Sequence, residues 1–309
     1  MGPQAFRSSG DLLADRRFDY AMAAKADGDL TAAADLLVQA LEIAPHWAAG
    51  WFTLGEVEMA RGDHGAAATA FRQALDRDPT DMFGAQLMLA RLGEVGAAEA
   101  MTPAYVTALY EDYAPRFEQA LREGLAYRGP EVLLDAVTRA RAASGEPLRF
   151  DRVLDLGCGT GLAGEVFAPF AGTIDGVDLS GRMVEIARRK GIYERLAVSD
   201  LAAHLAALPD ASADLLVAAD VFIYCADLGP ILAEAGRVLS KAGLCAFTVE
   251  SHDGDGVVLG AGLRYAHAEP VLQEALAAGG LRPVVFEPAT TRREAGQPVP
   301  GWLVVACRA

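Results

Sequence analysis

The stretch from Arg152 to Ser180 constrains the fold of this chain more than any other part. It begins RVLDLGCGTG, in which an apolar run without polar alternation leads into three glycines spaced two residues apart. Such a run is typical of a strand buried on both faces of a parallel sheet. Gly157, Gly159 and Gly161 allow a tight turn and let the backbone approach a ligand closely. A helix is predicted directly after them, and its first N–H groups favour an anionic ligand.

Three acidic residues accompany this glycine loop. Asp178 ends the next apolar run, at the strand tip where doubly wound sheets grip a ribose diol. Asp155 lies within the first strand, where it can help to hold an ammonium group, and Asp200 follows a third strand, placed for an adenine amino group. These spacings predict a nucleoside-cofactor site. Residues Gly159 to Gly164 also fit the Gly-x-Gly-x-x-Gly dinucleotide fingerprint, so a nicotinamide-dependent oxidoreductase is an alternative.

The order of acid, glycine loop, acid and acid resembles the Class I S-adenosylmethionine-dependent methyltransferases over about residues 151–309. The resemblance implies S-adenosyl-L-methionine as the cofactor and S-adenosyl-L-homocysteine as the product. On this reading Asp178 grips the ribose hydroxyls, Asp200 with Leu201 holds the adenine, and the glycines approach the methionine portion. The implied cofactor-binding residues are Asp155, Gly157, Gly159, Gly161, Asp178, Leu179, Met183, Asp200, Leu201 and Ala219.

Apolar runs and helical segments alternate after the glycine loop, which predicts a parallel sheet covered on both faces. The last two strands are joined by a polar loop, residues 288–300, without a helix. They can therefore pair as a hairpin, so the final strand is expected to be antiparallel, which tells against a nicotinamide domain. The predicted fold is a doubly wound, seven-stranded, Rossmann-like α/β sheet of the methyltransferase type, with strands near 152–157, 173–178, 195–199, 213–219, 244–250, 282–287 and 301–308.

The first third of the chain repeats itself with a period of 34 residues: Gly28 and Pro45 of the first copy correspond to Gly62 and Pro79 of the second. The pattern resembles the tetratricopeptide repeat, a helix–turn–helix unit of that period. It predicts a small all-α domain over residues 15–96, after a loose N-terminus over residues 1–14. Such arrays bind peptides or join subunits, so a protein or peptide partner and self-association are both alternatives.

Residues 103–145 are predicted to be a helical cap or linker, and residues 150–309 the catalytic domain. Helices at this position resemble the cap that folds over the cofactor in methyltransferases of the subgroup that carries these repeats. The resemblance makes Tyr113 and Tyr127 candidates to face the methyl donor. A packing role in the core is the alternative for both rings.

The acceptor pocket is expected beyond the tip of the fourth strand. The chain lacks the Asn/Asp-Pro-Pro-Tyr/Phe motif there, which argues against methylation of nucleobases and glutamine. Candidate catalytic residues are Tyr224, His252 and His267, with Arg264 as a substrate-side group. Each of these side chains could instead have a purely structural role. Arg292 and Arg293 could clamp an acidic acceptor, but the polar loop that carries them is predicted to be solvated.

The composition of the chain restricts the kinds of partner that it can bind. The net charge of −15 argues against a nucleic-acid surface, and the spacing of the four cysteines predicts no metal site. The absence of a long apolar run or a leader-like N-terminus predicts a cytoplasmic protein without a membrane segment. A closed pocket under aromatic helices suits a small-molecule acceptor. The alternatives are a protein or peptide methyltransferase recruited through the repeats, and a cofactor-binding scaffold without turnover.

Overall fold

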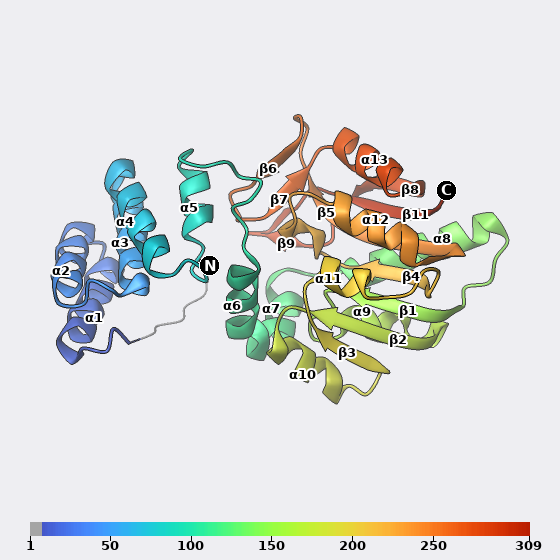
Figure 1. Ribbon diagram of the computed structural model, residues 1–309, viewed down its shortest axis with the longest axis horizontal. Coiled ribbons are helices and arrows are strands. Elements are labelled where there is room, and N and C mark those ends of the chain that lie inside the picture. The colour runs from blue at the N-terminus through green and yellow to red at the C-terminus, as the bar shows by residue number, and fades with distance from the viewer. Residues whose placement is uncertain (1–7) are drawn as a thin grey trace. The chain divides into compact units, whose positions relative to one another are not determined.

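The structure is a computed structural model that describes residues 8–309, apart from the side chains of residues 122 and 123. The chain forms two compact units, which divide between Asp112 and Tyr113. We name the part up to Asp112 the repeat unit and the part from Tyr113 onward the sheet unit. Figure 1 colours the repeat unit from blue to blue-green and the sheet unit from green to red.

Paired helices build the repeat unit, which confirms the predicted all-α repeats. Asp29 and Asp63 each begin the second helix of a pair, and the carboxylate of each accepts a hydrogen bond of 2.9 Å from the backbone N–H three residues later. The same cap therefore recurs with the period of the sequence repeat. The helices are α1 (Leu12–Ala26), α2 (Leu30–Ile43), α3 (Ala48–Arg61), α4 (His64–Arg77), α5 (Ala85–Arg91) and α6 (Pro103–Tyr113).

The start of the chain differs in part from the predicted loose segment over residues 1–14. Residues 1–7 lie outside the described residues. From there on the chain is ordered by side chains: the N–H and hydroxyl of Ser9 donate to Asp15 at 2.8 and 2.6 Å, and Asp11 caps α1 through the N–H groups of Leu13 and Ala14. These hydrogen bonds satisfy the first free N–H groups of α1, so the helix already begins at Leu12.

Close helix packing in the repeat unit depends on Gly55. A Cβ atom at this position would lie 2.5 Å from Cε1 of Phe71, which is fully buried. We therefore expect Gly55→Ala to destabilise the repeat unit by about 1–3 kcal/mol. Gly65→Ala is the matched control, because a Cβ there would meet no atom closer than 3.7 Å. Thermal unfolding of the full chain, followed by circular dichroism, measures both; equal melting of the two variants would contradict this account.

The sheet unit has the predicted methyltransferase-type topology. Its main strand order is β3-β2-β1-β4-β5-β11-β8, and β11 runs antiparallel to both neighbours, which confirms the predicted sheet and its last strand. The strands are β1 (Phe150–Leu156), β2 (Ala171–Asp178), β3 (Arg195–Val198), β4 (Ala213–Ala218), β5 (Leu239–Ser251), β6 (Val257–Leu259), β7 (Tyr265–His267), β8 (Leu281–Ala289), β9 (Arg293–Glu294), β10 (Gln297–Pro298) and β11 (Gly301–Arg308).

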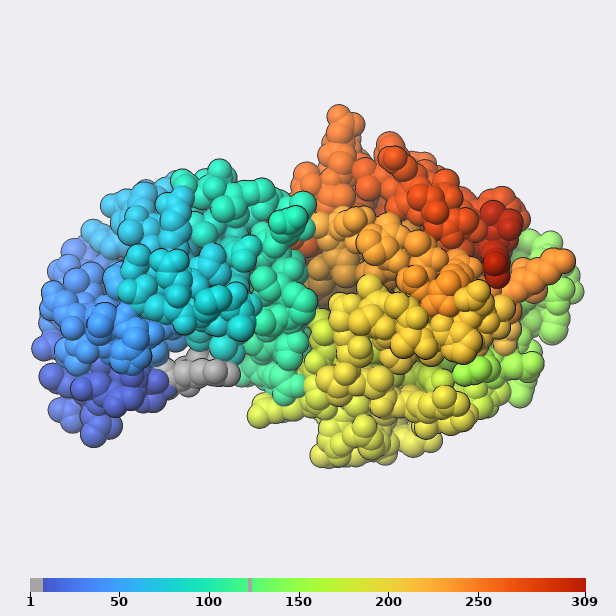
Figure 2. All heavy atoms as spheres, viewed as in Figure 1, coloured from blue at the N-terminus to red at the C-terminus, as the bar shows by residue number. Residues whose placement is uncertain are grey.

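Two short hairpins, β6–β7 and β9–β10, were not predicted. The first joins the main sheet through β7, which pairs with the end of β5. The second lies between β8 and β11 and pairs only within itself among the described residues. In Figure 2 the orange segment that includes the β5–β6 connection projects from the rest of the sheet unit. Both hairpins follow the carboxyl ends of strands, the edge at which α/β sheets bind ligands.

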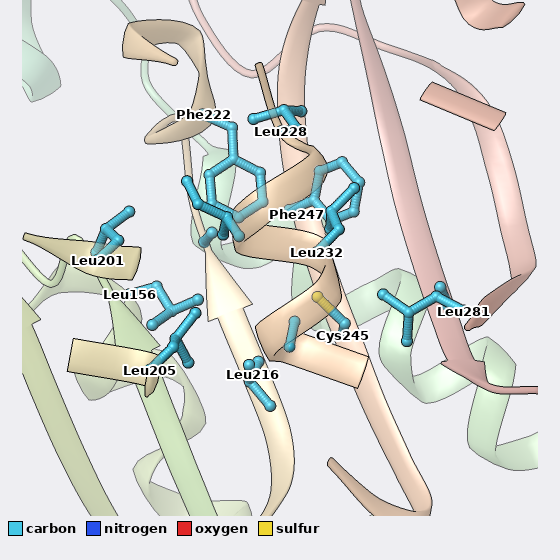
Figure 3. Close-up of a cluster of buried hydrophobic side chains, with 14 of the residues drawn as sticks. Leu156, Leu201, Leu205, Leu216, Phe222, Leu228, Leu232, Cys245, Phe247 and Leu281 are labelled. Carbon is cyan, nitrogen blue, oxygen red and sulfur yellow. The ribbon is translucent and has the colours of Figure 1, made fainter. Parts of the chain in front are cut away.

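Helices cover the sheet on both faces. On one face α11, α12 and α13 bury an apolar cluster over the central strands, part of which Figure 3 shows around Leu216 and Phe247. On the other face α8 packs Leu133 and Val137 against the sheet. The remaining elements are η1 (Ala114–Arg116), α7 (Phe117–Gly124), α8 (Gly129–Ser144), α9 (Leu162–Phe167), η2 (Ala168–Phe170), α10 (Gly181–Arg189), α11 (Leu201–Ala206), η3 (Phe222–Tyr224), α12 (Gly229–Val238) and α13 (Glu269–Ala278).

The segment 103–145, predicted to be a helical cap or linker, consists of several helices. It crosses the division between the units, and its last helix, α8, has an apolar face of Leu133, Val137 and Ala140 that is buried in the core of the sheet unit. That helix therefore covers the sheet rather than the edge where a ligand would bind. Within residues 8–309, none of the helices is both long enough and apolar enough to cross a membrane.

Candidate active site

The glycine loop joins β1 to α9 at the carboxyl edge of the sheet. Gly157 and Gly159 have φ angles of 65° and 52°, in the left-handed region that other residues rarely adopt. A Cβ at Gly157 would lie 2.5 Å from Cγ1 of Val221, so the backbone there rests directly on this side chain. At Gly159 the nearest atom would be 3.7 Å away, on Phe117. The loop is thus held tightly at Gly157 and is open at Gly159, as a cradle for a ligand requires.

Asp178 connects the glycine loop to the tip of β2. Its Oδ2 accepts a hydrogen bond of 2.9 Å from the N–H of Gly159, and its Oδ1 accepts one of 2.8 Å from the N–H of Ser180. The chain thereby brings together the two motifs that the sequence places on separate strands. A half-buried carboxylate at this strand tip has the hydrogen-bonding capacity to bind a diol as well.

Asp155 is a buried acid two residues before Gly157. Its side chain is almost fully buried, and its Oδ2 accepts a hydrogen bond of 2.6 Å from the hydroxyl of Tyr193. Burial raises the pKa of Asp155 to about 7, and the charge of Asp178 adds to this rise, although the hydrogen bond from Tyr193 opposes it. A contact of this carboxylate with an ammonium group remains a prediction.

The residues predicted to hold the adenine gather at the tips of β2 and β3. These tips are adjacent, because the N–H of Ser199 donates to the carbonyl of Asp178 at 3.0 Å. Asp200 is exposed and caps α11 by accepting from the N–H of Ala203 at 3.1 Å. Met183 and Leu201 are buried, and Leu179 is half-buried. Ala219, a further predicted cofactor-binding residue, is half-buried at the tip of β4. The chemistry of this set, a carboxylate beside apolar side chains, fits an adenine ring and its amino group.

The aromatic candidates Tyr113 and Tyr127 lie on two sides of the same edge. Tyr113 packs edge-to-face on Phe117, with ring centroids 5.5 Å apart, and Phe117 faces the glycine loop at Gly159. The hydroxyl of Tyr127 donates to the carbonyl of Ala219 at 3.4 Å. Burial raises the pKa of Tyr127 well above its ordinary value, and the negative charge of Asp220 contributes to the rise. Tyr127 is therefore a neutral hydrogen-bond donor.

The candidate catalytic residues lie around the ends of β4, β5 and β7. His252 is bonded within its own loop: Nδ1 accepts from the N–H of Gly254 at 3.1 Å, and Nε2 lies 3.1 Å from the carbonyl of Gly256. His267 is fully buried, and its Nε2 lies 3.0 Å from the carbonyl of Cys225. Burial lowers the pKa of His267. His267 thus contacts the residue next to Tyr224, and it pairs with Ser251, the residue before His252.

A family model described as a methyltransferase domain matches residues 154–247, which include the glycine loop and the tips of β2, β3 and β4. A second model, described as a tetratricopeptide repeat, matches residues 24–92. The chain joins tetratricopeptide repeats to a methyltransferase domain. The predicted resemblance is thus confirmed, and S-adenosylmethionine is the cofactor of methyltransferases with this fold. We refer to the sheet unit from here on as the methyltransferase unit.

Two curated relatives match part of the methyltransferase unit. Methyltransferase-like protein 27 of Homo sapiens is 34% identical over 109 residues, which are 35% of this chain and 43% of that protein. Malonyl-[acyl-carrier protein] O-methyltransferase of Serratia marcescens is 30% identical over 98 residues, which are 32% of this chain and 38% of that protein. The chain therefore spans less than half the length of these relatives.

Solved structures share the fold at low identity. The 1,6-didemethyltoxoflavin-N1-methyltransferase of Burkholderia thailandensis, with bound 1,6-didemethyltoxoflavin and S-adenosylhomocysteine, has a TM-score of 0.50 and 19% identity, over 66% of this chain and 89% of that one. The [4+2]-cyclase SpnF has a TM-score of 0.53 and 19% identity, over 66% of this chain and 95% of that one. At such identities the likeness shows the fold alone.

A cluster of charged residues lies at the tips of β4 and β5, where the acceptor pocket is expected. Arg292 is buried, and it forms ion pairs with Asp220 at 2.9 Å, with Glu294 at 3.2 Å and with Glu250. Arg264 pairs with Glu250 at 2.6 Å and also with Glu294. We name these five residues the charge cluster. It ties the hairpins β6–β7 and β9–β10 to the tips of β4 and β5.

The prediction that the loop over residues 288–300 is solvated is wrong for Arg292 and correct for Arg293, which is exposed. The physical reason is the group of acidic side chains that Arg292 meets. Burial alone would lower the pKa of Arg292, but the carboxylates of Asp220 and Glu250 raise it above its ordinary value. Arg292, directly before β9, is buried, whereas Arg293, the first residue of β9, is exposed. Arg264, predicted to bind the substrate, forms ion pairs with Glu250 and Glu294, which also pair with Arg292.

Proposed function

We propose that the methyltransferase unit transfers a methyl group from S-adenosylmethionine to a small-molecule acceptor and releases S-adenosylhomocysteine. The observation that carries the proposal is the connection between Gly159 and Asp178. It places an open glycine loop and a strand-tip carboxylate side by side, with a second carboxylate, Asp200, on the adjacent tip. This spacing suits the methionine, ribose and adenine portions of one extended cofactor.

Each portion of the cofactor has proposed partners among these residues. Asp178 would accept hydrogen bonds from the ribose hydroxyls, and the backbone of the glycine loop would contact the methionine portion. Asp200 and Leu201 would hold the adenine, with Leu179 and Met183 packed on its ring. Asp178 would keep its hydrogen bonds from the N–H groups of Gly159 and Ser180, because a carboxylate has further lone pairs for a diol.

The bound cofactor supplies an activated methyl group on a sulfonium centre. The protein then has to orient the acceptor in line and exclude water. Tyr113 and Tyr127 are proposed to form part of that enclosure. If the acceptor atom must lose a proton, Tyr224, His252 and His267 are the proposed candidates; the buried, neutral ring of His267 is the most protected from solvent.

The ligands and names of the similar proteins indicate acceptors of different kinds. One solved structure with this fold contains 1,6-didemethyltoxoflavin, a small molecule, beside S-adenosylhomocysteine. One curated relative is named for an acceptor attached to a carrier protein. The tetratricopeptide match favours a second candidate function, the methylation of a protein or of a protein-bound group that the repeats recruit. The fold does not fix the reaction, since SpnF is described as a cyclase.

Replacing Asp178 by alanine should weaken the binding of S-adenosylhomocysteine by about 30- to 1000-fold, which corresponds to about 2–4 kcal/mol. The loss combines the missing ribose contacts with the lost tie to Gly159. Asp175→Ala is the matched control, because Asp175 lies on the same strand but before its tip. Isothermal titration of the full chain measures both affinities. Equal affinity of Asp178→Ala and the unchanged protein would refute the cofactor assignment.

The acceptor class is tested with a radiolabelled methyl donor and a cell extract separated by size. We expect the label in the small-molecule fraction. Label found only in macromolecules, and lost when residues 1–96 are deleted, would favour recruitment by the repeats.

A further inference from the structure

Asp220 has an unusual backbone at the tip of β4. Its φ angle is 56°, in the left-handed region, which costs free energy for a residue with a side chain. Hydrogen bonds fix this conformation: the N–H of Asp220 donates to Oγ1 of Thr248 at 2.9 Å, and the same hydroxyl donates back to Oδ1 at 2.7 Å. Backbone strain that is held in place by surrounding groups is typical of functional sites.

A second set of bonds reaches Asp220 from the loop before β9. The hydroxyl of Thr291 lies 2.8 Å from Oδ2 of Asp220, and the guanidinium of Arg292 lies 2.9 Å from the same oxygen. The backbone of that loop is fastened in turn, because the carbonyl of Thr291 accepts from the N–H of Arg128 at 2.8 Å. The side chains of Thr291 and Arg292 are both nearly buried.

The residue after this strained turn is Val221, whose side chain supports the glycine loop. A Cβ at Gly157 would lie 2.5 and 2.6 Å from the two methyl groups of Val221, so the α-carbon of Gly157 packs directly on them. A change in the turn at Asp220 would move Val221 and thus the base of the loop. Thr291 and Asp220 are therefore connected to the glycine loop by an unbroken series of contacts.

We propose that Thr291 and Asp220 are positioning residues for the cofactor. By fixing the turn before Val221, they hold Gly157 and the loop that follows it in the shape that binds the cofactor. This inference rests on the proposed function. It also assigns a role to the loop before β9, whose contact with Asp220 would set the shape of the glycine loop.

The test compares four forms of the full chain: the unchanged protein, Thr291→Val, Thr291→Ser and Arg293→Gln. Valine keeps the shape of threonine but lacks the hydroxyl, serine retains the hydroxyl, and Arg293 is the exposed neighbour. We expect Thr291→Val to weaken the binding of S-adenosylhomocysteine about tenfold and to speed amide hydrogen exchange in residues 154–162. Serine should restore both values, and Arg293→Gln should leave both unchanged.

The results separate this inference from the proposed function. A purely structural role for Thr291 would lower the melting temperature without changing affinity or exchange in residues 154–162, and that result would overturn the proposal. If the unchanged protein failed to bind S-adenosylhomocysteine, the proposed function would be wrong. Hydrogen exchange in the glycine loop would then decide whether Thr291 positions it.

Discussion

Replacing Arg292 by glutamine should lower the free energy of unfolding of the methyltransferase unit by about 3–5 kcal/mol. The side chain of Arg292 is 6% exposed, and its guanidinium pairs with three carboxylates. Glutamine is shorter and neutral, so Asp220, Glu250 and Glu294 would face one another with only Arg264 to balance them. Removing one partner of a buried ion pair is costly because the remaining charges stay buried. Urea unfolding followed by circular dichroism measures the loss.

Arg293→Gln is the control for this prediction, since it makes the same chemical change at an exposed position. It should change stability by less than about 0.5 kcal/mol. The double variant Asp220→Asn, Arg292→Gln should be less destabilised than the sum of the two single variants, because it removes both members of one pair. Equal stability of Arg292→Gln and Arg293→Gln would show that the charge cluster does not stabilise the fold.

Replacing Asp155 by asparagine should make the methyltransferase unit more stable at pH 8, by up to about 4 kcal/mol. Folding raises the pKa of this carboxyl group from 3.8 to about 7. Between these two values the folded protein holds a proton that the unfolded chain releases. The contribution of Asp155 to stability is therefore greatest below about pH 4, falls as the pH rises through this window, and is fully lost above about pH 7. Asparagine has no such titration and still offers an oxygen to the hydroxyl of Tyr193.

The measurement is the difference in unfolding free energy between the two proteins from pH 4 to pH 8. The difference should be near zero at pH 4 and grow with pH; a difference independent of pH would contradict the buried, titrating carboxyl group. Binding of S-adenosylmethionine by the same variant addresses the proposed ammonium contact. If the variant is more stable but binds S-adenosylmethionine more weakly, the charge of Asp155 contributes to cofactor binding.

The main strands could be predicted because most of them contain a short apolar run that ends at glycine or at a polar residue. The run from Ala213 to Ala218, for example, was placed to within one residue. The hairpin β6–β7 could not be predicted, since its strands have only three residues each, which is too short for a periodic pattern. Pairing with the end of β5, which lies outside any local pattern, makes them strands. Such long-range pairing overrides local propensity.

The residues proposed to bind the cofactor could be singled out from the sequence because they lie in contiguous motifs. The contacts that hold these and the neighbouring residues in place could not, since the partners are far apart in the chain. Arg292 pairs with a carboxylate 72 positions earlier. Tyr193 contacts Asp155, 38 positions away, from a loop without a motif. An acid at the end of β5 and an arginine in a polar loop carry no sign of mutual burial until the sheet brings them together.

The place of β11 in the sheet has a consequence for synthesis of the protein. β11 lies between β5 and β8, yet it follows both of them in the chain. A nascent polypeptide that has emerged only as far as Pro300 holds two strand edges with nothing to pair between them, and the side chains of Leu303, Val304 and Val305 are missing from the core. Exposed edges of this kind recruit other chains. A polypeptide that lacks β11 should therefore be prone to aggregation.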